Sequence, residues 1–276
     1  MYSKVYVEIG NVCNMNCSFC HGHSRAPRQM SIEEFEYILD KLTTHTRFIY
    51  YHLMGEPLVH PQLPDFIKLA RKHSYKSVIT TNGTLLSDRK EELLASGVHK
   101  VNISVHSFED GSDEDFNRYI CQIADFAKSA AEAGVIITFR FWNKGYDDGR
   151  NELALRILQE QIPGDWVDNT RGIRVRDRIF IESAERFQWP DSNAEIQGSK
   201  FYCYGLKAQF GILADGTVVP CCLDSEGIIN LGNIFREDLN DILQSKRALA
   251  MCEGFDGGKA TEDLCQRCGF AQRFVR

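Results

Sequence analysis

Strand-like and helix-like segments alternate along the first two-thirds of the chain. Short apolar runs rich in β-branched and aromatic residues fall at 4–10, 47–54, 76–81, 100–106, 135–142 and 178–183. Amphipathic segments separate them, at 31–42, 63–73, 87–97, 115–134 and 152–162. Strict alternation of this kind predicts an α/β fold with a parallel sheet and helical crossovers. About six strands are fewer than the eight of a closed barrel, so the pattern fits an open or partial barrel or a doubly wound sheet.

Local signals mark where several of these helices begin and end. Ser31 is followed three residues later by Glu34, the pattern of a capping box, so we expect a helix to begin there. Gly97 and Gly134 stand directly after helical segments, where glycine commonly ends a helix in the left-handed conformation. The segment boundaries therefore rest on backbone chemistry as well as on periodicity.

The pattern changes after a polar linker at 189–200. In 209–220 two short strands flank Asp215-Gly216, a pair that favours a hairpin turn. The segment 237–252 has the periodicity of one helix. The last part of the chain is thus a hairpin and a helix, not a continuation of the alternating units.

We expect two domains, a partial barrel at 1–192 and a small α+β extension at 193–276. Six of the ten cysteines lie at 203–268, within the extension. A core of about 80 residues split between a hairpin and a helix is small, so we expect the extension to depend on a metal for its stability.

Composition is that of an ordinary globular protein, with 276 residues, 43% hydrophobic and 25% charged. The formal net charge of −6 disfavours a nucleic-acid partner, which would need basic residues to neutralise phosphates. The sequence has no apolar run of about 18 residues and no signal peptide at its N-terminus. We therefore expect a cytoplasmic protein with no membrane partner, and in that reducing compartment clustered cysteines indicate metal or redox chemistry.

Three cysteines, Cys13, Cys17 and Cys20, stand within eight residues between the first strand and the first helix. A loop in that position lies at the carboxyl end of the sheet, where α/β folds build their active sites. Zinc would need a fourth ligand, which His21 or His23 could supply. A cubane iron–sulfur cluster held by three thiolates would instead leave one iron open to a substrate or cofactor.

The spacing C-x3-C-x2-C, with aromatic Phe19 before the third cysteine, resembles the radical S-adenosylmethionine (SAM) superfamily. The resemblance extends across the alternating region and favours a partial (β/α)6 TIM-like barrel. It implies that Cys13, Cys17 and Cys20 bind a [4Fe-4S] cluster whose fourth iron chelates the amino and carboxylate groups of SAM. It also implies that Phe19 flanks the adenine of SAM.

A second stretch of the resemblance is "MGEP" at 54–57, at the end of the second strand. It is similar to the family's Gly-Gly-Glu-Pro motif, whose backbone and acid receive the SAM ammonium. Gly55, Glu56 and Pro57 match the motif, whereas Met54 replaces the first glycine. His52, just before it, is a candidate to line the same site.

The ends of the next strands extend the set of candidate SAM contacts. "TTNG" ends the third strand as family members often do, which makes Asn82 a candidate, although a turn with positive φ at Gly83 explains the sequence equally well. Ser104 and His106 alternate onto one face of the fourth strand, where relatives hold the ribose and carboxylate of SAM. Arg140, at the end of the fifth strand, is a candidate contact to SAM or substrate.

The late cysteines resemble the twitch half of the SPASM extension of radical SAM enzymes. A cysteine, a Gly-x4-Cys hairpin and a final C-x2-C imply one auxiliary [4Fe-4S] cluster, held by Cys203, Cys221, Cys265 and Cys268. A zinc ribbon using the same thiols is the competing interpretation. We expect Cys121 and Cys252 to be small buried residues. We expect Cys222, next to a ligand, to pack against the cluster, with a redox or acid–base role as its alternative.

The resemblance implies reductive cleavage of SAM to a 5′-deoxyadenosyl radical, which abstracts a hydrogen from the substrate. The auxiliary cluster would then take an electron from the substrate radical, so a small-molecule dehydrogenation results, with a flavodoxin or ferredoxin as reductant. A peptide-maturing enzyme, an RNA-modifying enzyme and a non-catalytic redox-sensing iron–sulfur protein are the alternatives. Because the first strand begins by about residue 4, we expect any leader-binding module for a peptide to be a separate protein. No residue can be assigned from the sequence as the acid or base that acts on the substrate.

Overall fold

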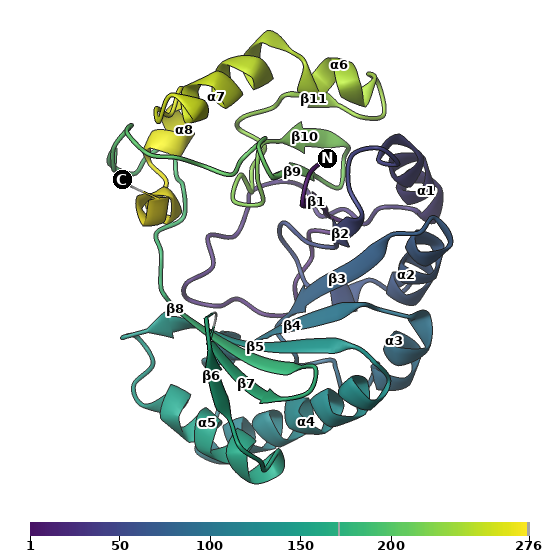
Figure 1. Cartoon of the computed structure of the whole chain (residues 1–276), viewed down its shortest axis with the longest axis vertical. Coiled ribbons are helices and arrows are strands. Elements are labelled where there is room, and N and C mark those ends of the chain that lie inside the picture. The colour runs from purple at the N-terminus through teal and green to yellow at the C-terminus, as the bar shows by residue number, and fades with distance from the viewer. Residues whose placement is uncertain (171, 275–276) are drawn as a thin grey trace.

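The computed structural model describes residues 1–170 and 172–274 and shows one curved sheet with helices on its outer face (Figure 1). Its eleven strands are β1 (Lys4–Val7), β2 (Phe48–Tyr50), β3 (Lys76–Thr81), β4 (Lys100–Ser104), β5 (Ile136–Lys144), β6 (Val167–Asn169), β7 (Gly172–Arg176), β8 (Ile179–Glu185), β9 (Gln209–Ile212), β10 (Thr217–Val219) and β11 (Gly232–Asn233). Across the sheet their order is β11-β10-β9-β1-β2-β3-β4-β5-β8-β7-β6.

Six of these strands form the parallel core that the alternating sequence predicts. β1 to β5 are parallel neighbours in chain order, and β8 continues the series beside β5. The partial TIM-like barrel is therefore confirmed, and the sheet is curved, with its inner face turned away from α1 to α5 (Figure 1). Because the strands are parallel, the loops after their carboxyl ends meet at one rim of the sheet.

Helices α1 to α5 cover the outer face of the curved sheet, and the remaining helices lie in the C-terminal region (Figure 1). Ser31 and Glu34 form the expected capping box at the start of α1. Gly97 and Gly134 adopt φ of 83° and 87° at the ends of α3 and α4, as predicted. The helices are α1 (Ile32–Lys41), α2 (Leu63–Lys72), α3 (Lys90–Ser96), α4 (Asp113–Glu132), α5 (Arg150–Gln161), α6 (Leu239–Leu243), α7 (Lys246–Asp256) and α8 (Asp263–Gln266).

The core lies between the sheet and these helices. Each helix turns an apolar face inward, as α1 does with Phe35, Ile38 and Leu39, and the strand residues between them are almost fully buried. In the described part of the chain, no helix has both the length and the apolar character needed to cross a lipid bilayer.

Two strands between α5 and β8 were not expected from the sequence. β6 pairs antiparallel with β7, and β7 pairs antiparallel with β8. All three residues of β6 are exposed, so this edge has little of the apolar alternation by which a strand is recognised. The insertion extends the sheet beyond the sixth parallel strand without adding a barrel unit.

The C-terminal region is joined to the barrel by a strand. β9 runs parallel to β1, with four residue pairs from Lys4–Gln209 to Val7–Ile212, and forms the predicted hairpin with β10. The prediction of one helix over 237–252 is wrong: α6 and α7 are separate helices. Ser245 caps α7 by accepting a hydrogen bond from the Ala248 N–H, an interaction that competes with helix continuation.

Candidate functional site

The early cysteines lie in the loop between β1 and α1, at the rim formed by the carboxyl ends of the parallel strands. Cys13 and Cys20 are exposed and Cys17 is half-buried. The Cys20 N–H donates to the Cys17 carbonyl at 3.1 Å, and the Met15 N–H lies 3.5 Å from the Cys13 Sγ. Burial raises the pKa of Cys17 to about 11, with contributions from Glu109 and from the thiolates of Cys20 and Cys13. The three thiols are thus close enough to interact.

Side chains from two neighbouring strand ends hold this loop. The Ser18 N–H and hydroxyl donate to the Glu109 carboxylate at 2.5 and 2.6 Å. The Asn14 amide donates to the Thr84 hydroxyl at 2.9 Å and accepts from the Asn82 amide at 2.9 Å. Asn82, a predicted cofactor contact, therefore joins the end of β3 to the cysteine loop.

The Gly55-Glu56 stretch packs directly against the same loop. Gly55 has φ of 79°, and a Cβ there would lie 2.5 Å from the Gly10 carbonyl oxygen. The Glu56 N–H donates to the Val12 carbonyl at 2.9 Å. The Glu56 carboxylate is buried and accepts from the backbone N–H groups of Asn82 and Leu58 at 2.7 and 3.0 Å, while burial raises its pKa to about 7. This acid fixes the backbone of the site.

The residues on either side of Gly55-Glu56 are also held in place. The Met54 N–H donates to the Glu8 carboxylate at 3.1 Å, so this position is anchored by its backbone. Glu8 also accepts from the Ala214 N–H at 3.0 Å and from both terminal nitrogens of Arg25, at 2.6 and 2.8 Å. Pro57 is buried and begins a short 3-10 turn. The stretch at 54–57 and the C-terminal hairpin thus share one buried carboxylate.

The remaining candidate SAM contacts gather on the inner face of β4 and β5. The rings of Phe19 and His106 lie 4.8 Å apart between centroids. His106 Nδ1 is 3.0 Å from the Arg140 carbonyl oxygen, and the Arg140 Nε is 3.6 Å from Glu182. Ser104 lies on the same face. Among the described residues, the buried Arg140 Nε has no hydrogen-bond partner, since Glu182 faces it from beyond hydrogen-bond distance.

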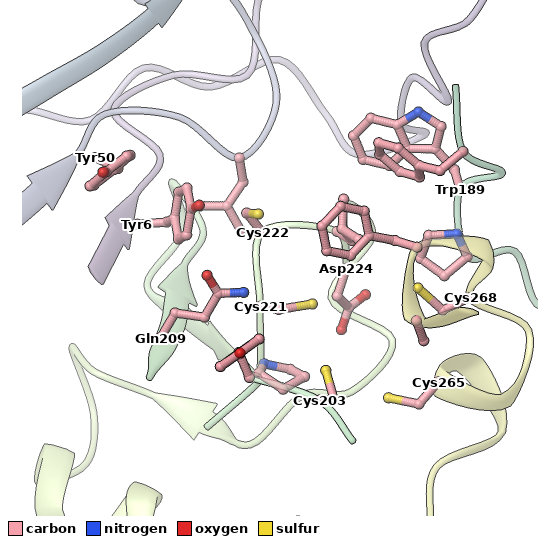
Figure 2. A pocket seen from close by; sticks show the side chains of 18 of the residues that line it. Tyr6, Tyr50, Trp189, Cys203, Gln209, Cys221, Cys222, Asp224, Cys265 and Cys268 are labelled. Atoms are coloured by element: carbon pink, nitrogen blue, oxygen red, sulfur yellow. The ribbon is translucent and has the colours of Figure 1, made fainter. Parts of the chain in front are cut away.

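The four predicted auxiliary ligands come together although they are spread over 66 residues of sequence. Figure 2 shows Cys203, Cys221, Cys265 and Cys268 in one part of a pocket, with Cys222 above Cys221 and next to Tyr6. Burial, together with the thiolates of Cys222, Cys203, Cys265 and Cys268, raises the pKa of Cys221 well above its usual value. The Gly205 N–H lies 3.4 Å from the Cys203 Sγ. The loop before β9, the β10 end and α8 supply these thiols.

The other three cysteines occupy different environments. Cys121 on α4 and Cys252 on α7 are half-buried and pack against the core, as expected. Cys222 lines the pocket and forms a side-chain hydrogen bond with Tyr6. It is thus neither a simple core residue nor one of the four predicted ligands.

One cavity of about 570 Å³ connects the two groups of residues. Its wall includes Phe19, Ser104, His106 and Arg140 from the barrel side and the four late cysteines from the C-terminal region. Further aromatic and polar side chains complete the lining, among them Tyr6, Tyr50, His52, Trp189, Gln209 and Asp224 (Figure 2).

The thiols are suitable donors for iron–sulfur clusters. Such clusters are held by cysteine sulfurs that often accept hydrogen bonds from backbone N–H groups. Cys13 and Cys203 each have a backbone N–H directed at the sulfur. Three donors on one loop leave a coordination position free, whereas the four late cysteines can complete a coordination sphere. Within the part of the chain that the structure describes, no three Cys, His, Asp or Glu side chains are placed to hold a single metal ion.

Comparison with known families agrees with this geometry. Residues 7–143 match the radical SAM superfamily. The chain belongs to it. Residues 203–269 match SPASM, an iron–sulfur cluster-binding domain, which favours iron–sulfur over zinc at the late thiols. This radical SAM enzyme therefore uses a [4Fe-4S] cluster with SAM, and its C-terminal region carries auxiliary iron–sulfur chemistry.

Sequence relatives differ in what they do and in how much of this enzyme they match. A cofactor-modifying protein for tungsten-containing aldehyde ferredoxin oxidoreductase from Pyrococcus furiosus is 34% identical over 106 residues, which cover 37% of this chain and 30% of the relative. The first curated relatives are thus matched over about a third of their length. The sporulation killing factor maturation protein SkfB of Bacillus subtilis is 25% identical across 90% of this chain and 66% of SkfB.

Solved structures show the same fold at low sequence identity. BtrN in complex with AdoMet and 2-DOIA superposes with a TM-score of 0.63 at 19% identity, covering 97% of this chain and 93% of BtrN. SuiB of Streptococcus suis bound to S-adenosylmethionine gives 0.63 at 16% identity, covering 99% of this chain and 72% of SuiB. These likenesses establish the fold of the whole chain, barrel and extension together.

Several residues of the cavity wall were not singled out from the sequence. Lys4 and Tyr6 lie on the inner face of β1, and Glu8 follows on the same face. The signal was present, since in "KVYVE" every second residue is polar or aromatic while the valines between them are buried. Trp189 and Asp224 come from irregular segments, for which the sequence offers no comparable periodicity.

Proposed function

We propose that this radical SAM enzyme oxidises a small molecule, with SAM and an auxiliary [4Fe-4S] cluster on opposite sides of the substrate. The observation that carries the proposal is the single cavity of about 570 Å³ whose wall includes both Phe19, His106 and Arg140 and the four late cysteines. When bound, these groups supply one-electron chemistry: SAM yields a 5′-deoxyadenosyl radical that takes a hydrogen atom from substrate carbon, and the auxiliary cluster accepts the electron left on the substrate.

The chain's own residues position these groups. Cys13, Cys17 and Cys20 hold the first cluster, and Cys203, Cys221, Cys265 and Cys268 hold the auxiliary one. Gly55 lets its backbone approach the cysteine loop, and the buried Glu56 fixes the backbone whose carbonyl oxygens would accept hydrogen bonds from the SAM ammonium. Phe19 and His106 provide an aromatic surface for the adenine.

The size of the cavity supports a small substrate. Pockets of about 300–1,000 Å³ accommodate one drug-sized ligand, and SAM is itself of that size. SAM and two clusters therefore leave limited room in about 570 Å³. Its lining is largely aromatic and aliphatic with a few polar groups, as in pockets that enclose a small ligand.

A paired cysteine experiment tests this assignment. Anaerobically reconstituted protein should contain about eight irons per chain, and both Cys17→Ala and Cys265→Ala should contain about four. Only Cys17→Ala should lose conversion of SAM to 5′-deoxyadenosine under dithionite, because only its cluster touches SAM. About four irons in the unaltered protein would contradict the auxiliary cluster, and no SAM cleavage with intact clusters would contradict the enzymatic function.

Peptide maturation is a second candidate, favoured by the similarity to SkfB, a maturation protein, across 90% of this chain. A crystal structure of anSMEcpe with bound AdoMet and a peptide has the same fold. The two candidates differ in which class of compound stimulates SAM cleavage and is itself converted. A small molecule that stimulates 5′-deoxyadenosine formation and loses two electrons supports dehydrogenation, whereas stimulation by peptides alone supports maturation.

A further inference from the structure

Lys4 brings a positive charge into the cavity from the start of β1. Its ammonium lies 5.2 Å from the ring centroids of both Tyr6 and Tyr50, so two aromatic faces hold it. In the sheet Lys4 is paired with Gln209 of β9, whose side chain lines the same cavity. The ammonium therefore sits where the barrel and the C-terminal region meet.

This charge has no acidic partner in the part of the chain that the structure describes. Lys4 forms none of the ion pairs there, and the nearby Glu182 is 3.6 Å from Arg140. The loss of water on burial lowers the pKa of Lys4, and the opposite influence of Cys222 and of Glu182, which is paired with Arg140, does not offset it. Cation–π contacts compensate only part of that loss.

Apart from the paired charges of Arg140 and Glu182, the groups around Lys4 are neutral. Burial, with the charges of Arg140 and Lys4, lowers the pKa of His52 to about 3, so its imidazole is uncharged near neutral pH. The His52 Nδ1 is buried without a hydrogen-bond partner among the described residues. Tyr6 keeps its proton and pairs with Cys222. The subsite therefore offers one positive charge without a carboxylate of its own, beside a neutral imidazole.

We propose that Lys4, Tyr6, Tyr50 and His52 form a substrate subsite that binds a carboxylate, so that the substrate is a small organic acid. A carboxylate supplies the single negative charge and the acceptor oxygens that these groups lack. A phosphate monoester carries about −1.5 to −2 charge near neutral pH, more than one lysine balances. The aromatic rings of Tyr6 and Tyr50 leave apolar surface beside the ammonium for the carbon skeleton of the acid.

The subsite deepens the proposed function and rests on it. Cys222 connects Tyr6 to the neighbouring Cys221, so a carboxylate at Lys4 places the rest of the substrate in the cavity beside the auxiliary cysteines. Phe19 and Arg140 line the same cavity from the barrel side. The anchored acid would thus lie between the two cofactor-binding ends.

Two probes of equal shape and different charge test the subsite. Cyclohexanecarboxylate and cyclohexylmethanol are titrated into SAM-bound protein with reconstituted clusters, and binding is followed by calorimetry and by saturation-transfer NMR. The carboxylate should bind at least about tenfold more tightly than the alcohol, the effect of a charge-assisted hydrogen bond. Inorganic phosphate serves as a third probe and should compete weakly or not at all.

Variants assign the preference to Lys4. Lys4→Met should remove the preference for the carboxylate, while Lys68→Met, which alters an exposed lysine of α2, should keep it. Cluster absorbance and the thermal midpoint show whether Lys4→Met is folded, and Lys4→Arg should restore part of the preference. Equal binding of acid and alcohol, no binding of either, or a preference that survives Lys4→Met overturns the subsite.

SAM cleavage by the unaltered protein is measured in the same preparations. Cleavage without a carboxylate preference contradicts the subsite and leaves the proposed function standing. A carboxylate preference without any cleavage contradicts the proposed function, and the two failures are therefore distinguishable.

Discussion

Gly55 is the residue at which the backbone comes closest to the cysteine loop. Its φ of 79° is unfavourable for other residues, and a Cβ would lie 2.5 Å from the Gly10 carbonyl oxygen. We expect Gly55→Ala to lower the free energy of unfolding by about 2–4 kcal/mol, from strained φ and steric displacement together. It should also weaken SAM binding, because the Gly55-Glu56 backbone must move away from the loop. Anaerobic denaturation and calorimetric titration with SAM measure the two effects.

Gly134 provides the matched control. It has φ of 87°, but a Cβ there meets nothing within 4 Å. Gly134→Ala should therefore cost about 1 kcal/mol from φ alone and leave SAM binding unchanged. Equal effects of the two substitutions on SAM binding would show that the close approach at Gly55 has no functional role.

His52 gives a prediction for pH dependence. Its pKa is lowered from 6.5 to about 3, by burial and by the charges of Arg140 and Lys4. Between these values the unfolded chain binds a proton that the folded chain does not, so the free energy of unfolding rises with pH, by up to about 1.4 kcal/mol per unit. The stability that the folded protein owes to a neutral His52 is therefore fully present above about pH 6.5 and is lost progressively as pH falls below that value.

His52→Gln lacks this titration. Its stability should fall less steeply than that of the unaltered protein between about pH 6.5 and 5, and the two curves should run parallel above about pH 7. Anaerobic urea denaturation at half-unit pH intervals makes the comparison. Parallel curves over the whole range would show that His52 is protonated in the folded protein.

Single side chains differ in how much the sequence says about them. Some can be recognised directly, because a metal or a strained backbone restricts which residue can stand there. Examples are the spacing of Cys13, Cys17 and Cys20 and the Gly55-Glu56 pair. Lys4 is an ordinary residue for a strand, and only the pairing of β1 with β9 places it in a cavity. The residues around Lys4 come from segments up to about 200 residues away in the sequence. Local periodicity carries no information about contacts between such distant segments.

Helices and parallel strands were predictable as elements because each has its own signal. The capping box of α1 and the glycines after α3 and α4 fix ends locally. β6 lacks alternation and β7 alternates over only four residues, from Ile173 to Arg176, so tertiary pairing decides their conformation. The break between α6 and α7 depends on whether Ser245 caps a helix or continues one, and helical periodicity alone favoured the wrong choice.

The cysteine loop depends on an ion pair at its base. Arg25 donates to Glu8 with both terminal nitrogens, and the Glu8 side chain is fully buried while that of Arg25 is 15% exposed. The Arg25 Nε also donates to the Ser225 carbonyl at 2.7 Å, which joins the loop to the C-terminal region. Arg25→Met should therefore destabilise the protein by about 3–5 kcal/mol, because it leaves a buried carboxylate without its countercharge.

The double variant separates charge from packing. Adding Glu8→Gln to Arg25→Met removes the uncompensated carboxylate and should recover much of the lost stability, measured by anaerobic denaturation. Ser24 and Glu226 still join the same segments, through contacts of 2.6 and 3.0 Å. Additive losses in the double variant would show that the two side chains do not act as a pair.

The molecule as a whole is more continuous than the sequence suggests. The change of pattern near residue 192 predicts two domains, and the matched families fall on either side of it. Yet the sheet runs without interruption from β5 through β1 into β9 and β10. Composition and periodicity detect the change in pattern, but they cannot detect a strand pairing between residues so far apart.

This continuity predicts that the two regions unfold together and stay together when the connection between them is cut. A protease site placed at Asn193–Glu195, in the irregular segment after β8, allows cleavage of the folded protein with its clusters in place. The fragments should co-elute in size-exclusion chromatography, because β1–β9 pairing, the hydrogen bonds Arg25–Ser225 and Ala214–Glu8, and the shared cavity all cross the cut. Thermal unfolding of the uncut protein should show one transition. Fragments that separate while keeping their iron, or two transitions in the uncut protein, would contradict this prediction. Barrel and extension would then be independent folding units, and only the covalent connection would hold the two sides of the cavity together.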